Sequence, residues 1–192
     1  MHYMTRKADR MRVWMGLPIS LALALSLVPH MGATTLEQLT LDDMIQKSTA
    51  IVRARVTGSH TGTRAGNIYT YFQFQVIENW KGRTSGEVAV PGGVAGGIRQ
   101  SVSGSPEMKT GQEYVLFLWT SGSGLTQVIG LSQGIFKLSE EGSGGGGVAI
   151  AQRPPASELM LDRSGRPVED HAVTMQLQDL RTRVHQALRA AK

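Results

Sequence analysis

The feature that most constrains this chain is the segment Ile68–Gly82, which has the sequence IYTYFQFQVIENWKG. In its centre every second side chain is apolar: Phe72, Phe74 and Val76. Alternation of apolar and polar residues is the pattern of a β-strand that buries one face. The pattern slips at Ile77, before Trp80, and this slip predicts a β-bulge where the sheet curls towards closure.

Neighbouring segments predict the strands that accompany it. Ala50–Gly58 alternates in the same way and places Arg53 and Arg55 on one face, which is more typical of a solvated strand than of an anion site. Ser59–Asn67 is predicted to be a polar loop that joins the two strands into a hairpin. Glu113–Thr120 is apolar on both faces and should be the most buried strand. Further strands are predicted at Glu87–Pro91, Leu125–Gly130, Gly134–Glu140 and Val148–Ala151.

Two helices are predicted beside these strands. Thr40–Asp43 has the pattern of a capping box, in which the Thr hydroxyl accepts a free backbone N–H, and a short helix over Leu41–Lys47 follows. A longer helix is predicted to begin after Pro167 and to end near Ala190. Its apolar stripe consists of Val173, Leu177, Leu180, Val184 and Leu188. The stripe predicts packing on the outer face of the sheet, with a partner helix or a membrane surface as alternatives.

The N-terminus is predicted to be an export signal. Residues 1–33 hold four basic side chains and one acidic side chain, followed by the apolar run Trp14–Val28 and the small residues Gly32 and Ala33. This is the pattern of a secretory signal peptide cleaved after Ala33, and an uncleaved membrane anchor is the alternative. The mature protein would be secreted or periplasmic, with no stable membrane span after cleavage. Much of the net charge of +5 lies in this segment, so no nucleic-acid partner is predicted.

Several motif matches are rejected on their context. Gly130–Gly134 fits the G-x-S-x-G pattern of a hydrolase nucleophile at Ser132, and aspartates and histidines follow it: Asp162 or Asp170, and His171 or His185. That nucleophile requires a strand-to-helix turn, whereas the residues after it predict another strand. The run Gly142–Gly147 meets a dinucleotide-binding pattern trivially, because most of it is glycine. Without any cysteine, disulfides and thiolate zinc sites are excluded, and no catalytic residue, cofactor or metal is predicted.

The order of these elements resembles the netrin-like module of the tissue inhibitors of metalloproteinases, and it is similar to small exported bacterial proteins without an assigned function. The resemblance covers about Leu41–Leu138 and is carried by VRARV at residues 52–56, by Val76–Gly82 and by Gly111–Leu118. It implies an all-β fold with flanking helices, an OB-like antiparallel β-barrel. The implied organisation is a signal peptide at 1–33, the barrel at 34–151, a connector at 152–167 and the C-terminal helix at 168–192.

The resemblance also implies a function. We expect an exported, non-enzymatic protein-binding or protease-inhibitor-like module, whose partner is a secreted metalloprotease or another exported protein. In that family an N-terminal cysteine chelates the zinc of the protease, and this chain has Thr34 instead. A cell-envelope glycan or other ligand is the alternative partner, and a serine hydrolase is the least favoured function. The candidate binding residues are Thr34, Thr35, Tyr69, Tyr71, Gly92 and Gly93.

Overall fold

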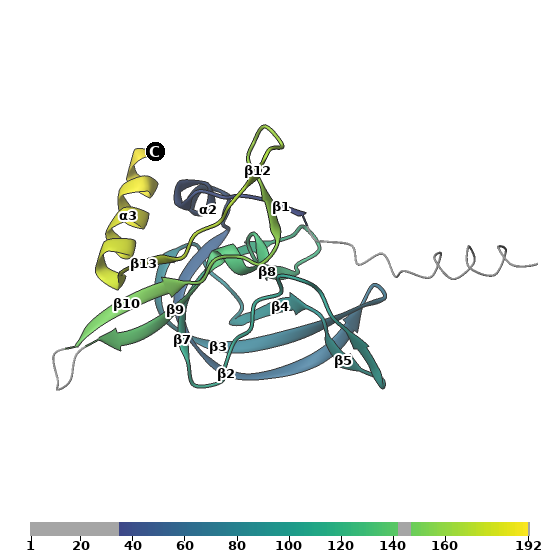
Figure 1. Ribbon diagram of the computed structural model, residues 1–192. Coiled ribbons are helices and arrows are strands. Elements are labelled where there is room, and N and C mark those ends of the chain that lie inside the picture. The colour runs from purple at the N-terminus through teal and green to yellow at the C-terminus, as the bar shows by residue number, and fades with distance from the viewer. Residues whose placement is uncertain (1–34, 142–146, 192) are drawn as a thin grey trace, which may run out of the picture. The chain divides into compact units, whose positions relative to one another are not determined.

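The computed structural model describes residues 35–141 and 147–191, and these residues are mostly β-strand with two helices (Figure 1). The predicted signal peptide, its cleavage site and Thr34 lie outside the described residues. No helix within the described ranges is long and apolar enough to cross a bilayer.

The elements follow one another along the chain in a simple order. The first half holds β1 (Thr35–Glu37), α2 (Leu41–Lys47), β2 (Ala50–Arg64), β3 (Asn67–Lys81), β4 (Glu87–Pro91), β5 (Gly93–Ala95) and β6 (Ile98–Gln100). The middle holds β7 (Glu113–Thr120), β8 (Thr126–Val128), the 3-10 helix η2 (Leu131–Gly134), β9 (Ile135–Glu141) and β10 (Val148–Arg153). The last part holds β11 (Leu159–Leu161), β12 (Pro167–Val168), β13 (Val173–Gln176) and α3 (Leu177–Ala190).

One antiparallel sheet dominates the fold. Its strand order is β13-β10-β9-β7-β2-β3-β4, and β8 pairs with β7 off this path. The sheet curls until β4 lies beside β8, but the two strands share no hydrogen-bonded ladder, so the described residues form no closed barrel. Two smaller sheets, β1-β11-β12 and β5-β6, accompany it.

The curl has a local cause in the pairing of β2 with β3. The register shifts three times, and the residues left without a partner are Thr57 on β2 and Ile77 and Trp80 on β3. An extra residue on one strand bends it and increases its twist. The predicted slip near Ile77 is therefore confirmed as a pair of bulges.

Hydrophobic residues form two core clusters on opposite faces of β7. Tyr114, Leu116 and Leu118 point into an inner cluster between the curled strands. Val115 and Phe117 point into an outer cluster, which the helices α2 and α3 cover. All five side chains are buried, so the expectation that Glu113–Thr120 is buried on both faces is confirmed.

The short helix forms as its sequence predicts. The Thr40 hydroxyl accepts a hydrogen bond from the Asp43 N–H at 3.1 Å, and the Asp43 carboxylate accepts the Thr40 N–H in return. At the other end, Lys81 of β3 donates to the carbonyls of Ile45 and Gln46. Cations stabilise a helix C-terminus, so Lys81 fixes α2 on the sheet. Burial lowers the pKa of Lys81.

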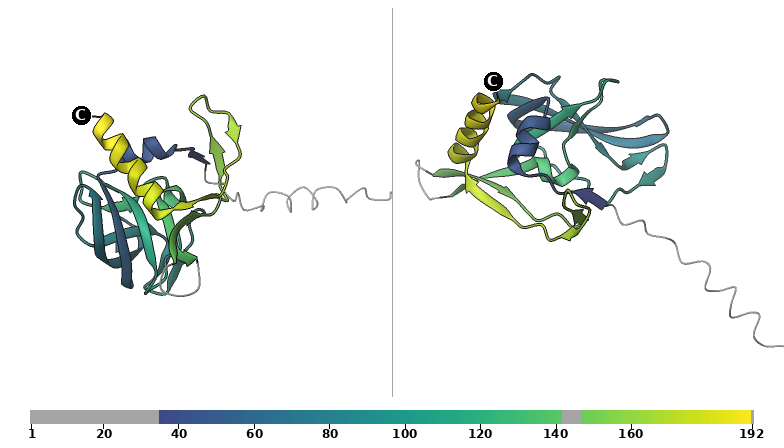
Figure 2. Two further views of the ribbon diagram at one scale, coloured as in Figure 1. Left: turned by 90° about the vertical axis from the view of Figure 1, so that its left-hand side faces the viewer. Right: turned by 90° about the horizontal axis from the view of Figure 1, so that it is seen from above.

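The long helix is shorter than the sequence predicts. It begins at Leu177, not after Pro167, because Val173–Gln176 is the strand β13 and pairs with β10. Leu177, Leu180 and Val184 join the outer cluster, which confirms packing on the sheet. Figure 2 shows α2 and α3 next to each other, and the Gln46 side chain donates to the Ala187 carbonyl across them.

The predicted loops also need correction. Ser59–Asn67 is not a loop, because β2 continues to Arg64 and only Ala65 and Gly66 form the turn. The residues after Gly92, for which no element is predicted, contain the hairpin β5-β6, with its turn at Gly96 and Gly97. The predicted strand Val148–Ala151 is longer than expected, because β10 extends to Arg153.

The predicted connector at 152–167 is ordered by a buried ion pair. Its residues include β11 and part of β12. Arg153 holds Asp170 through two hydrogen bonds of 2.6 and 3.0 Å, with 8% and 5% of the two side chains exposed. Asp170 also accepts the Ala156 N–H. Burial alone would raise the pKa of Asp170, but the hydrogen bonds from Arg153 and Ala156 lower it below its usual value.

Candidate functional site

Three ring-bearing side chains lie together on the outer face of the β2-β3 hairpin, near its turn. His60 pairs with Tyr71 across the two strands, and Tyr69 lies two residues further along β3. The His60 and Tyr71 rings stack at 5.1 Å between centroids with 13° between planes, and the Tyr69 ring centroid lies 6.2 Å from that of Tyr71. His60 is exposed and both tyrosines are half-buried. We call these three residues the aromatic row.

The register of the hairpin brings the row together. The two-residue turn has positive φ at Ala65 (48°) and Gly66 (80°), as a type I′ turn requires. This turn pairs Arg64 with Asn67, and from there the ladder places His60 opposite Tyr71. Gly62 lies under the Tyr71 ring, because a Cβ at this position would stand 3.3 Å from Tyr71 Cε2. Glycine therefore lets the ring lie flat against the strand.

The inner face of the same hairpin is covered by β5, so it is not available to a partner. The Thr61 hydroxyl donates to the Val94 carbonyl at 2.7 Å. Gly93, with φ at 134°, passes so close that a Cβ would lie 2.7 Å from Thr70 Oγ1. Gly92, with φ at 102°, is also close to its neighbours, because a Cβ there would lie 3.0 Å from the Gln100 carbonyl oxygen. The candidates Gly92 and Gly93 are thus required by this close packing, on the opposite face from the aromatic row.

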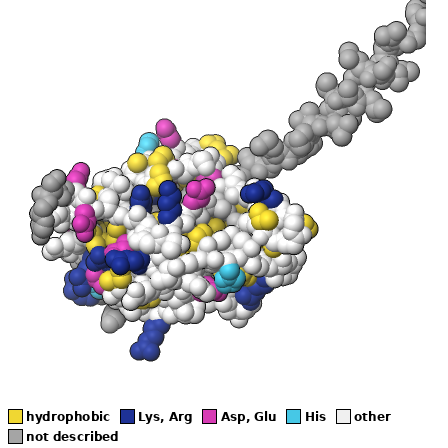
Figure 3. All heavy atoms as spheres, turned by 90° about the horizontal axis from the view of Figure 1, so that it is seen from below, with side chains coloured by type: hydrophobic (Ala, Val, Ile, Leu, Met, Phe, Trp, Pro, Cys, Tyr) yellow, Lys and Arg dark blue, Asp and Glu magenta, His cyan; other side chains and the backbone are white. Residues whose placement is uncertain are grey.

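Other exposed apolar side chains gather at the same end of the molecule. Val94 and Ile98 of the β5-β6 hairpin are 42% and 66% exposed. Arg64 donates to the Ser123 carbonyl at 2.6 Å and thereby joins the β2-β3 turn to the β7-β8 turn. Figure 3 shows the underside of the molecule, where basic and acidic side chains are interspersed and neither sign forms an extended area.

The remaining binding candidate, Thr35, lies apart from this end. It belongs to β1, is exposed, and pairs in parallel with Leu159 of β11 in a separate small sheet. The structure therefore brings Tyr69 and Tyr71 together but joins neither Thr35 nor the glycines to them.

The nucleophile pattern at Ser132 lies in a different local structure from the strand-to-helix turn that a hydrolase nucleophile requires. Ser132 lies in the 3-10 helix η2, and β9 follows directly. It lines a cavity of about 400 Å³ with Tyr114 and Glu158, and neither His171 nor His185 is part of that lining. Burial raises the pKa of Tyr114. Within residues 35–141 and 147–191, no group of three His, Cys, Asp or Glu side chains could hold a metal.

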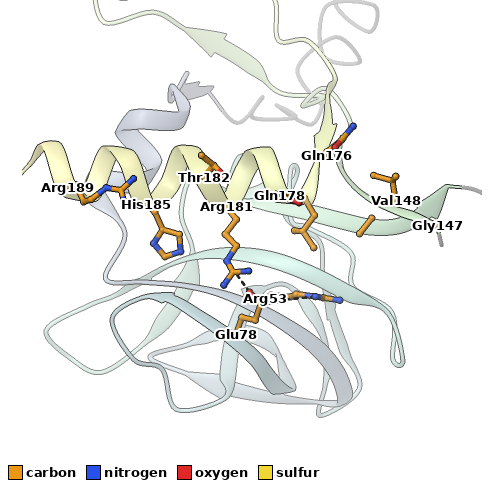
Figure 4. Close-up of a pocket in the computed structure, with 12 residues that line it drawn as sticks. Arg53, Glu78, Gly147, Val148, Gln176, Gln178, Arg181, Thr182, His185 and Arg189 are labelled. Atoms are coloured by element: carbon orange, nitrogen blue, oxygen red, sulfur yellow. Dashed lines mark hydrogen bonds and ion pairs between the residues drawn. The ribbon is translucent and has the colours of Figure 1, made fainter. Parts of the chain in front are cut away.

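A second concave surface lies between α3 and the sheet, and its volume is about 850 Å³ (Figure 4). Glu78 forms part of it and accepts hydrogen bonds from Trp80 at 3.0 Å and from Arg53 at 3.1 Å. Arg181 of α3 approaches the same carboxylate at 3.5 Å. The Trp80 hydrogen bond, followed by that of Arg53, lowers the pKa of Glu78, so this group stays charged at neutral pH. We call this surface the α3 groove.

Arg53 is held on its other side by Glu113 of β7. Its guanidinium lies 2.8 Å from that carboxylate, which also pairs with Arg55 at 2.5 Å. Burial opposes the ionised form of Glu113, but the hydrogen bonds from both arginines lower its pKa. The predicted solvated face of Arg53 and Arg55 is thus a network of ion pairs.

No protein-family model, curated protein or solved structure matches the chain.

Sequence reasoning found Tyr69 and Tyr71 but missed His60 and the α3 groove. His60 could have been found from the sequence. A two-residue turn at Ala65 and Gly66 fixes the register of the hairpin, and this register pairs His60 with Tyr71. The groove depends on contacts between Glu78 and Arg181, which lie far apart in the chain. No local pattern predicts such a contact.

Proposed function

We propose that this protein is an exported, non-enzymatic protein-binding module, and that the aromatic row is its binding surface. The observation that carries the proposal is the stack of the exposed His60 on the half-buried Tyr71, with Tyr69 beside it, on the outer face of the hairpin. Neither core cluster includes any of the three side chains. They are therefore available to a partner.

The flat shape of the row supports a protein partner over a small ligand. Sites for small molecules are concave and enclose most of the ligand. None of the three rings lines the α3 groove or the cavity beside Ser132. Tyrosine is enriched at the centres of protein interfaces, because its ring buries a large area while its hydroxyl keeps a hydrogen bond. Flat aromatic strand faces suit this kind of contact.

The arrangement of the strands supports an OB-like interpretation of the fold. Each strand lies next to its neighbour in the cyclic order β2, β3, β4, β8, β7, although the step from β4 to β8 lacks a ladder. OB folds are partly open barrels that bind along their second and third strands and at the loops between strands 1 and 2 and strands 4 and 5. Here those strands are β3 and β4, and Arg64 joins the two corresponding turns.

The experiment that tests the proposal is affinity capture from the exported fraction of the host, with single substitutions in the row. Tyr71→Ser and Tyr69→Ser should each abolish capture of the same partner that the unchanged protein retains. Trp119→Ser is the matched control, because Trp119 is an aromatic side chain of β7 with 42% exposure outside the row. Capture that survives both tyrosine substitutions, or that Trp119→Ser also removes, would contradict the proposal. Capture of a glycan by the same residues would replace the protein partner with a carbohydrate.

A further inference from the structure

The α3 groove carries more positive charge than its own acids neutralise. Four arginines belong to it or pair at its edge: Arg53, Arg55, Arg181 and Arg189. Three of them, Arg53, Arg55 and Arg181, share two carboxylates, those of Glu78 and Glu113. Four positive and two negative charges leave an excess of two. Arg189 forms no ion pair with an acidic side chain of the described residues, so part of this excess is free to meet a ligand.

The donors on the helix side of the groove are regularly spaced. Arg181, His185 and Arg189 all line the groove and follow one another at intervals of four residues. Such residues share one helix face, with a rise of about 6 Å between successive members. Figure 4 shows Arg181 and His185 directed from α3 towards the sheet. The groove thus presents a row of nitrogen donors along its length.

This spacing matches an extended peptide. Alternate residues of a β-strand project to the same side and lie about 6.6 Å apart. Acidic side chains at every second position would therefore meet the three donors in turn. A segment with acidic side chains at three alternate positions is five residues long, and its remaining side chains would point out of the open groove, whose volume is about 850 Å³.

We propose that the α3 groove binds an extended acidic peptide segment, with alternate carboxylates facing Arg181, His185 and Arg189. Guanidinium groups suit this role because their planar forks bind carboxylates through two parallel hydrogen bonds. Glu78 acts as a positioning residue, since its carboxylate fixes Arg53 and Arg181 at the floor of the groove. The site is distinct from the aromatic row, because the two surfaces share no residue.

The test measures binding of two labelled octapeptides to the full chain by fluorescence anisotropy at low salt. One peptide alternates Glu and Thr, and the other carries the same residues as a block of Glu followed by a block of Thr. Arg189→Gln and Arg183→Gln are compared, because both lie on α3 and give variants of identical composition and charge. Arg183 is exposed and is not part of the groove lining.

The alternating peptide should bind more tightly than the block peptide, and Arg189→Gln should weaken it about fivefold. Arg183→Gln should change its affinity by less than about twofold, and high salt should weaken binding to the unchanged chain. Equal losses in the two variants, equal affinities for the two peptides, or no binding at low salt would overturn the proposal. Binding of inorganic polyphosphate alone, lost in Arg189→Gln, would overturn it in favour of a polyanion site.

Discussion

The outer face of the β2-β3 hairpin differs sharply between its two halves. In the half next to α2, Ile51 and Trp80 are buried in the outer cluster beneath the helices. In the half next to the turn, His60, Tyr69 and Tyr71 lie on the same face, and they are exposed or half-buried and belong to neither core cluster. Both halves carry large apolar or aromatic groups, but the chain itself buries only one of them.

This difference separates a stabilising surface from the surface that we propose binds a partner. Large side chains on the covered half exclude water within the protein and should contribute strongly to the free energy of unfolding. The same kind of side chain on the uncovered half contributes little to that free energy, and it excludes water only when a partner arrives. Substitutions in the two halves should therefore have opposite profiles, large on stability in one and large on binding in the other.

The largest effect on stability is expected in the covered half. Trp80→Ala should lower the free energy of unfolding by about 3–5 kcal/mol, because it leaves a cavity under α2 and α3 in place of a ring that is 6% exposed. Urea melts measure this quantity. A loss below about 1 kcal/mol would show that the helices do not bury this half.

The position of α3 over that half also depends on the buried ion pair of Arg153 with Asp170, which holds the segment before β13 and α3. Asp170→Asn leaves the Arg153 guanidinium without its partner and should cost about 3–5 kcal/mol at neutral pH. Because the folded pKa of Asp170 is lowered, its contribution is present above the usual pKa and disappears as the pH falls through the lowered one.

The variant should therefore lose less stability than the unchanged protein between pH 7 and about pH 3. Urea melts at a series of pH values test this, with Asp179→Asn, an exposed position of α3, as the control. Parallel pH profiles for the unchanged protein and Asp170→Asn would show that the buried pair is not responsible.

The uncovered half should respond in the opposite way. Tyr71→Ser removes the stack on His60, which is worth about 0.5–1.5 kcal/mol, and leaves both core clusters intact. The same variant should lose its partner in the capture experiment. A loss of stability as large as that of Trp80→Ala would place Tyr71 in the core and remove the distinction between the two halves.

The smallest change sharpens the comparison further. Gly62→Ala adds a Cβ that would lie 3.3 Å from Tyr71 Cε2, so the Tyr71 ring must move away by a few tenths of an ångström. Stability should change by less than about 0.5 kcal/mol, because the position is on an exposed strand face. Partner capture should still weaken, since the flat packing of the ring is altered. Unchanged capture would show that the partner does not contact the Tyr71 ring.

Much of the fold follows from local sequence patterns. The strands at Glu87–Pro91 and Glu113–Thr120 have the predicted bounds, and the capping box at Thr40 forms as expected. These features depend on alternation and on side chains within three residues of each other. Nearby residues determine these features, and distant parts of the chain do not change them.

The errors arose where distant contacts decide the structure. Val173 fits the apolar stripe of the helix, yet its backbone pairs with Arg153 of β10 and is extended. The connector is ordered by the pair of Arg153 with Asp170, which are seventeen residues apart. Tertiary pairing of this kind overrides a local helical pattern, and a single sequence does not reveal it.

The candidate site was predictable to a similar extent. Alternation placed Tyr69 and Tyr71 on the polar face of β3. His60 was assigned to a loop, because β2 extends further than its sequence predicts. The OB-like interpretation and the protein-binding role remain proposals, supported by the neighbour order of the strands and by the flat aromatic row.

The most direct test of the difference between the two halves is site-specific photo-crosslinking in cells that produce the protein. A photoreactive aromatic residue replaces Tyr71 in one strain and Trp119 in another, because both positions carry solvent-accessible aromatic side chains. The account predicts one discrete crosslinked protein from position 71 and none from position 119. No product from position 71, or the same product from both positions, would contradict the claim that the uncovered half of the hairpin is a binding surface.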